Sequence, residues 1–185
     1  MRNIPRVSFI AVATALLLAG CTPTDPIVKP EPAPSSTPIF ASEEDALAAA
    51  TAAYAAYVKV SDQITSDGGS DGDRIAPYVT EGQLARDLEV FEYYKSKGYF
   101  SRGQTKFDSV GLQSYVPDGP DGPELAIYLC TDYSAIRLVD STGSDVTPSD
   151  LPTRAPMEVT LQEADDSKSL VVERSESWSG TDFCS

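Results

Sequence analysis

Leu125-Ala126-Ile127-Tyr128-Leu129 is a run of apolar residues that ends in Cys130. A short apolar run bounded by turn signals predicts a strand inside a sheet. A turn signal stands directly before it, because residues 117–123 read Pro-Asp-Gly-Pro-Asp-Gly-Pro, and these residue types favour tight turns. We therefore expect a strand over 125–133 in the interior of a sheet.

Further extended segments lie on both sides of this strand. We expect one over 104–116 and a short one over 136–140. Residues 157–161 alternate apolar and polar side chains, Asp165-Asp166 marks a turn, and 169–178 runs back. This pattern predicts a hairpin, and the sheet is expected to be antiparallel.

Two helices are predicted ahead of the strands. Ser42 precedes three acidic residues, which is typical of a helix start, and apolar residues at three- and four-residue intervals extend the first helix from Glu43 to Ile64. Thr80 starts the second helix, from about Glu81 to Lys97, and Gly98 stands where a left-handed cap belongs. Helices followed by strands indicate an α+β fold. The apolar stripe of the first helix consists of Leu47, Ala50, Tyr54, Tyr57, Val58 and Ile64.

The first 20 residues have the order of a bacterial secretory signal: a basic head, an apolar core and small residues. Leu18-Ala19-Gly20-Cys21 resembles the lipobox of bacterial lipoproteins. The resemblance implies that Cys21 is diacylated, becomes the mature N-terminus and holds the protein on the extracytoplasmic face of the cell membrane. The alternative is an uncleaved anchor, but the apolar core is shorter than a membrane span.

Residues 21–41 form a proline-rich linker between this anchor and a domain over 42–185. Proline favours the extended polyproline conformation, so we expect a semi-rigid spacer that reaches about 60 Å. The alternative is a motif for a proline-binding partner, since residues 30–38 are dense in proline.

The formal net charge of the chain is −14. Loss of the signal removes Arg2 and Arg6 but no acidic residue, so the mature chain is more acidic still. An acidic surface repels nucleic acid and anionic lipid headgroups, so we expect no nucleic-acid partner. Membrane attachment is therefore expected to come from acyl chains.

The cysteine count fits an oxidising compartment. With Cys21 lipidated, Cys130 and Cys184 remain, and an even pair outside the cytoplasm predicts one disulfide. The sequence contains no histidine, and two distant thiols do not supply four zinc ligands, so we expect no metal site. No glycine-rich phosphate loop is present either, and we expect no cofactor.

The order of these segments resembles a group of small secreted lipoproteins of actinobacteria. The resemblance rests on Tyr54-Ala55-Ala56-Tyr57, on Leu84-Ala85-Arg86-Asp87-Leu88 followed by Gly98-Tyr99, on Cys130-Thr131-Asp132-Tyr133-Ser134, and on the end from Trp178 to Cys184. These proteins are similar to the nuclear transport factor 2-like, or cystatin-like, superfamily. The resemblance implies a cone-shaped curved antiparallel sheet around the helices, and it implies no particular activity.

Candidate chemistry is sparse, because serine and cysteine triads require a histidine. In the same superfamily, ketosteroid isomerases use a cavity carboxylate with a tyrosine or a second acid. The resemblance therefore offers Asp132 with Tyr54 or Tyr57, and a carboxylate beside apolar groups would have a raised pKa. The simpler interpretation makes Asp132 a turn cap and both tyrosines core residues.

Two other patterns have simple explanations. Residues 66–73 suggest a calcium loop, but a loop starting at Asp67 has Gly69 and Tyr78 at two ligand positions, so a polar turn is expected. The aromatic residues near the end of the second helix either rim a binding site or pack on the sheet; they are Tyr93, Tyr94, Tyr99 and Phe100.

We therefore expect a lipid-anchored extracytoplasmic protein with a non-catalytic binding or structural role. A cavity enzyme of the isomerase or dehydratase type, using Asp132 with Tyr54 or Tyr57, is the alternative. An accessory ligand-binding lipoprotein is a third interpretation.

Replacement of Cys21 by alanine is expected to abolish retention in the membrane, because no other thiol lies at the cleavage site. Fractionation of cells that express C21A measures this directly. Acylated and processed C21A protein in the membrane fraction would contradict the lipobox assignment.

Overall fold

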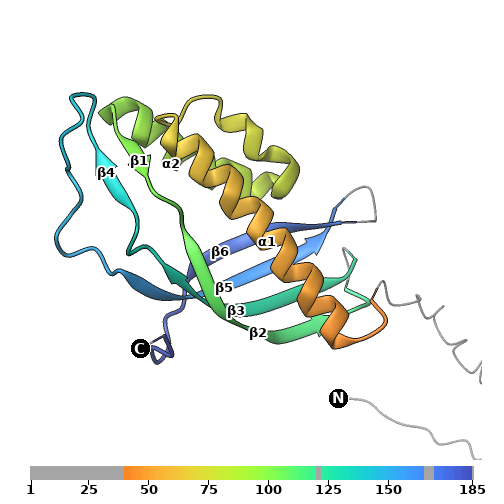
Figure 1. Cartoon of the computed structure of the whole chain (residues 1–185). Helices are drawn as coiled ribbons and strands as arrows, with labels where there is room; N and C mark the ends of the chain where they lie inside the picture. Colours follow the sequence, from red (N-terminus) through yellow and green to blue (C-terminus); the bar gives the residue numbers. More distant parts are fainter. Residues whose placement is uncertain (1–39, 120–121, 165–168, 185) are drawn as a thin grey trace, which may run out of the picture. The chain divides into compact units, whose positions relative to one another are not determined.

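The sheet that the sequence predicts is the central feature of the fold. In a computed structural model, residues 40–119, 122–164 and 169–184 are described. Four antiparallel strands lie in the order β2-β3-β5-β6, and the sheet curves without closing into a barrel (Figure 1). Their bounds are β2 Lys106–Val116, β3 Glu124–Asp132, β5 Arg154–Glu163 and β6 Leu170–Ser177.

One face of this sheet forms the hydrophobic core. Leu125, Ile127 and Leu129 are fully buried and alternate along β3, so they share a face of the sheet. Their register partners on β5 are Leu161, Val159 and Met157, which belong to the same core.

The helices cover that face (Figure 1). Helix α1 spans Glu43–Ser66 and helix α2 spans Glu81–Lys97, and a short 3-10 helix, η1 (Gly72–Tyr78), lies between them. The predicted caps are present: the Ser42 hydroxyl accepts from the amide of Asp45 at 3.1 Å, the Thr80 hydroxyl accepts from Gln83, and Gly98 is left-handed with φ 65°. The helix predictions are therefore confirmed, and the α+β class with helices against a curved antiparallel sheet is confirmed with them.

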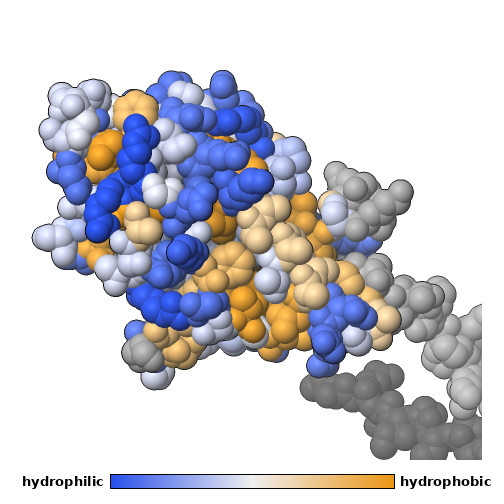
Figure 2. Space-filling view, in the orientation of Figure 1, coloured by the Kyte–Doolittle hydropathy of each residue, from blue (hydrophilic) through white to orange (hydrophobic). Residues whose placement is uncertain are grey.

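The buried stripe of α1 consists of Ala46, Ala50, Tyr54, Val58 and Ile64, while Leu47 and Tyr57 are only partly buried. Several residues on the solvent side are also alanines, including Ala48, Ala52 and Ala55. Figure 2 accordingly shows hydrophobic residues over the first half of α1, with hydrophilic residues gathered toward α2. None of the helices described is both long enough and apolar enough to span a membrane.

A second, two-stranded sheet pairs β1 (Phe100–Arg102) with β4 (Arg137–Val139). The predicted extended region 104–116 therefore corresponds to β2, and the predicted piece 136–140 to β4. The predicted hairpin is also present, because β5 and β6 are antiparallel neighbours. Strand β5 begins at Arg154, before the alternating segment 157–161 that the sequence predicts.

The opposite face of the sheet is covered by the C-terminal tail. Cys130 on β3 is joined to Cys184 by a disulfide that links residues 54 positions apart. The ring of Tyr128, two residues before Cys130, packs edge-on against Trp178 at 4.8 Å and Phe183 at 5.8 Å between ring centroids. The bridge thus holds two aromatic side chains on the outer face.

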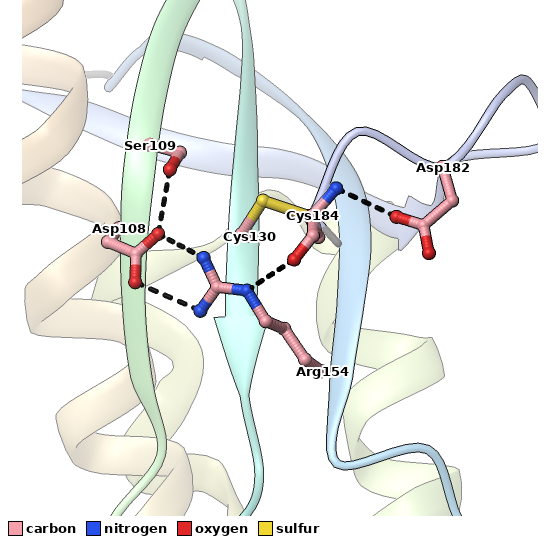
Figure 3. Close-up of a disulfide and its surroundings, with 6 residues drawn as sticks. All are labelled: Asp108, Ser109, Cys130, Arg154, Asp182 and Cys184. Carbon is pink, nitrogen blue, oxygen red and sulfur yellow. Dashed lines mark hydrogen bonds and ion pairs between the residues drawn. A yellow bond between two sulfur atoms is a disulfide. The ribbon is translucent and has the colours of Figure 1, made fainter.

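Arg154 reinforces this attachment (Figure 3). Its Nε donates to the carbonyl oxygen of Cys184 at 2.8 Å, and its two terminal nitrogens bind the carboxylate of Asp108 on β2. One guanidinium therefore connects the tail to a strand on the far side of β3.

The predictions for residues 1–20, for Cys21 and for nearly all of the linker over 21–41 lie outside the described residues. They stay predictions, as does the boundary between linker and domain. The same holds for the assignment to the nuclear transport factor 2-like superfamily, which is finer than the fold class that the structure shows.

Removal of the disulfide is expected to destabilise the domain by about 4 kcal/mol, because the bridge restricts a loop of roughly fifty residues in the unfolded chain. C130S and C184S should therefore cost similar amounts, and the double variant little more than either. Urea unfolding measures the three values. Single variants that unfold at the wild-type midpoint would contradict the structural role of the bridge.

Candidate functional site

A cavity of about 330 Å³ lies between α1, α2 and the end of the sheet. The exposed side chains of Arg86 and Val90 stand at its rim, so solvent can enter there. Most of the residues that line this cavity are aromatic or polar. The lining residues are Tyr54, Tyr57, Val58, Ser61, Asp62, Gln83, Arg86, Asp87, Val90, Phe91, Thr105, Tyr133, Met157 and Ser175.

Asp87 on α2 is the chemically distinctive member of this wall. Its side chain is only 7% exposed. Its Oδ1 accepts from the hydroxyl of Tyr57 on α1 at 3.1 Å and from Nε2 of Gln83 at 2.8 Å. Its Oδ2 is buried and has no hydrogen-bond partner among the described residues. One carboxylate oxygen is therefore fixed by two donors while the other is unused.

Gln83 and Arg86 hold this arrangement in place. The amide oxygen of Gln83 accepts from both Nε and Nη2 of Arg86, at 3.0 and 2.9 Å, so the amide nitrogen must point to Asp87. Nη2 of Arg86 also donates to the carbonyl oxygen of Glu173 on β6 at 2.8 Å. The guanidinium thus donates these hydrogen bonds to Gln83 and Glu173, and it ties α2 to the edge strand.

Burial controls the protonation of these groups. Burial raises the pKa of Asp87, while the hydrogen bonds from Gln83 and Tyr57 and the positive charge of Arg86 oppose that rise. Burial also raises the pKa of Tyr57, and the neighbouring Asp87 charge adds to this, so the Tyr57 hydroxyl stays protonated and available as a donor. Burial raises the pKa of Tyr54 to about 12. The site is a carboxyl group surrounded by neutral phenols.

A second and more open cavity of about 560 Å³ lies on the other side of Asp62, between α1 and residues 103–107. Asp62 lines both cavities. Its two carboxylate oxygens accept from the backbone amide and the hydroxyl of Thr105, at 2.8 and 2.7 Å. Unlike Asp87, Asp62 therefore has both oxygens occupied.

The predicted pairing of Asp132 with Tyr54 or Tyr57 is wrong in its geometry. Thr131, which is 1% exposed, continues the inner face of β3, so Asp132 lies on the outer face with Cys130. Its carboxylate accepts from the amide of Ser134 at 2.8 Å, and this hydrogen bonding lowers its pKa. Asp132 caps a turn, as the simpler interpretation held, and its pKa is not raised.

The other predicted site residues are distributed as follows. Tyr54 and Tyr57 meet at the cavity, with 5.8 Å between ring centroids. Cys130 and Cys184 lie on the outer face of the sheet, and Cys21 lies outside the described residues.

The polar loop after α1 has a structural role. Arg74 binds the carboxylate of Asp67 at 2.8 Å, which places a cation at the first position of the suspected calcium loop. Gly69 has φ +78°, and a Cβ there would lie 2.0 Å from the carbonyl oxygen of Phe91. The glycine therefore permits the loop to approach the backbone of α2 closely.

The aromatic cluster at the end of α2 is partly exposed. Tyr93 is 52% exposed, packs edge-on against Tyr99 and carries Lys97 over its ring. It does not line either cavity described above.

Sequence reasoning missed Asp87 and Gln83 as site residues. The buried stripe of α2 is Gln83, Asp87 and Phe91, at four-residue intervals, while Leu84 and Leu88 are only partly buried. Asp87 stands four residues before Phe91, so an acidic residue on an apolar helix face was the available signal.

The sequence matches no family model. It matches no curated protein either. Among solved structures, the intermembrane-space region of the chloroplast protein ARC6 is similar with a TM-score of 0.50 and 10% identity, over 71% of this chain and 97% of that chain. A periplasmic fragment of TraM gives 0.48 and 17% over 75% and 98%, and a protein from Catenulispora acidiphila gives 0.43 and 10% over 74% and 92%. At these identities the likeness concerns the fold alone.

Loss of the Tyr57 hydroxyl is expected to destabilise the domain at neutral pH by about 1–3 kcal/mol, because a buried acceptor loses a donor. The hydroxyl favours the charged form of Asp87 and so lowers its pKa. The cost of Y57F should therefore shrink as the pH falls and Asp87 becomes protonated. Urea unfolding of Y57F and wild type over a pH series measures it.

Y93F is the matched control, since the Tyr93 side chain is half exposed, and it should unfold like wild type at every pH. A Y57F cost that is absent at neutral pH, or that grows in acid, would contradict the contact between Tyr57 and an ionised Asp87.

Proposed function

We propose that this protein is an extracytoplasmic lipoprotein, anchored through Cys21, whose folded domain binds a small molecule in the cavity beside Asp87. The role is non-catalytic binding. The proposal assigns the binding role that the sequence suggests to a particular site of the domain.

The anchoring part of the proposal rests on the sequence order of 1–21 and on the disulfide. A signal-like segment leads into the lipobox-like Leu-Ala-Gly-Cys. The disulfide between Cys130 and Cys184 fits an oxidising compartment. A proline-rich linker would then hold the domain away from the membrane surface.

The binding part rests on one observation: Asp87 lines a cavity large enough for a small molecule, and its buried Oδ2 has no hydrogen-bond partner among the described residues. A buried acceptor without a partner costs roughly 1–3 kcal/mol. Ligand sites commonly combine an aromatic or apolar wall with a few polar groups that fix orientation. Oδ2 is not exposed in the cavity as it stands, so a ligand that donates to it must first displace the Asp87 side chain slightly, and the new hydrogen bond would recover that cost.

The enzyme alternative that names Asp132 is disfavoured by the placement of that residue. The enzyme alternative required Asp132 near Tyr54 or Tyr57, and these residues lie on opposite faces of the sheet. With no histidine in the chain, the usual neutral-pH general base is absent.

Filling the cavity tests this proposal. Ser61 lines the cavity and is half buried, so S61W should place an indole in the space that a ligand would use. A fragment library screened by saturation-transfer NMR is expected to give hits on wild type that S61W loses.

S96W is the control, because Ser96 is exposed on α2 and does not line the cavity. It should keep the wild-type hits. A screen in which no fragment depends on position 61 would contradict ligand binding in this cavity.

A further inference from the structure

We infer that the ligand of this cavity is a small organic cation, an amine whose protonated nitrogen donates to Oδ2 of Asp87. The inference rests on the proposed function and names the chemical class of its ligand. It follows from the acceptors, the charges and the rings of the wall.

The hydrogen bonds of Asp87 require that a ligand group bound to it be a donor. Both protein donors, Tyr57 and Gln83, are bound to Oδ1 of Asp87. Oδ2 is buried with no partner in the described part of the chain. A ligand group that reaches Oδ2 must therefore carry an N–H or an O–H, and an acceptor-only group such as a carboxylate or a phosphate would be repelled there.

The charge balance favours a cationic donor over a neutral one. Asp62 and Asp87 both line the cavity, and among the described residues of its wall Arg86 is the one basic side chain, whose charge offsets that of Asp87 only in part. Arg86 is exposed and its guanidinium binds Gln83 and the carbonyl of Glu173. A hydroxyl would give the Oδ2 of an ionised Asp87 one hydrogen bond, whereas an ammonium adds the attraction between opposite charges to that hydrogen bond.

The aromatic rings of the cavity wall also suit a cationic ligand. Tyr54, Tyr57, Phe91 and Tyr133 line the same cavity. Aromatic faces attract organic cations and bury the carbon skeleton that carries the charge. The net charge of −14 favours the approach of cations over anions. The cavity volume of about 330 Å³ restricts the ligand to a small molecule.

The test compares amines with neutral compounds of the same shape. Phenethylamine is paired with phenethyl alcohol, and cadaverine with pentanediol. Calorimetry is carried out on the full chain, purified from membranes and reconstituted in lipid nanodiscs. We expect at least one amine to bind wild type about ten- to a hundredfold more tightly than its alcohol, as a charged hydrogen bond predicts.

D87N is expected to lose most of that preference, because the replaced oxygen becomes an amide donor. D132N is the matched control: it removes the same charge on the outer face of the sheet and should bind the amines like wild type. The wild-type ratio of amine to alcohol needs no variant, so it decides the matter even if D87N does not fold.

Three results would overturn the inference. Alcohols that bind as tightly as their amines would make the site a neutral one, and the proposed function would stand. Amine binding that D87N leaves unchanged would place the cation elsewhere. An absence of amine binding to wild type would exclude this ligand class, while the S61W screen separately decides whether the cavity binds any small molecule.

Discussion

Side chains of β3 alternate between two faces, and a different part of the chain buries each face. Leu125, Ile127 and Leu129 lie under the helices, whereas Tyr128 and Cys130 receive the C-terminal tail. A strand that is buried on both faces has apolar residues at successive positions, because neither its odd-numbered nor its even-numbered side chains face solvent. This constraint places the disulfide outside the cavity and leaves the cavity wall to α1, α2 and the inner face of the sheet.

The sequence predicted the elements that depend on local signals. Ser42, Thr80 and Gly98 are caps whose chemistry acts within one helical turn, and all three were assigned correctly. The β5–β6 hairpin followed from alternation around a turn. The pairing of Cys130 with Cys184 followed from the cysteine count and the expected compartment.

The cavity depends on how separate elements meet, and the sequence does not encode that locally. Alternation groups Cys130 with Asp132 but does not say which face of β3 meets the helices. The buried face of α2 carries Gln83 and Asp87 because Arg86 binds the edge strand and Tyr57 supplies a donor from α1. These contacts join residues 30 or more positions apart, so the local sequence pattern did not indicate them.

The protonation of Asp87 reports whether its carboxylate is free of an ion pair. The carboxyl carbon of Asp87 can be followed by NMR as the pH is varied. A buried carboxyl group whose Oδ2 has no hydrogen-bond partner among the described residues is expected to titrate above the ordinary range of an aspartate. A pKa below that range would mean that Asp87 forms an ion pair with a cation such as Arg86, and would contradict an Oδ2 that is left for a ligand.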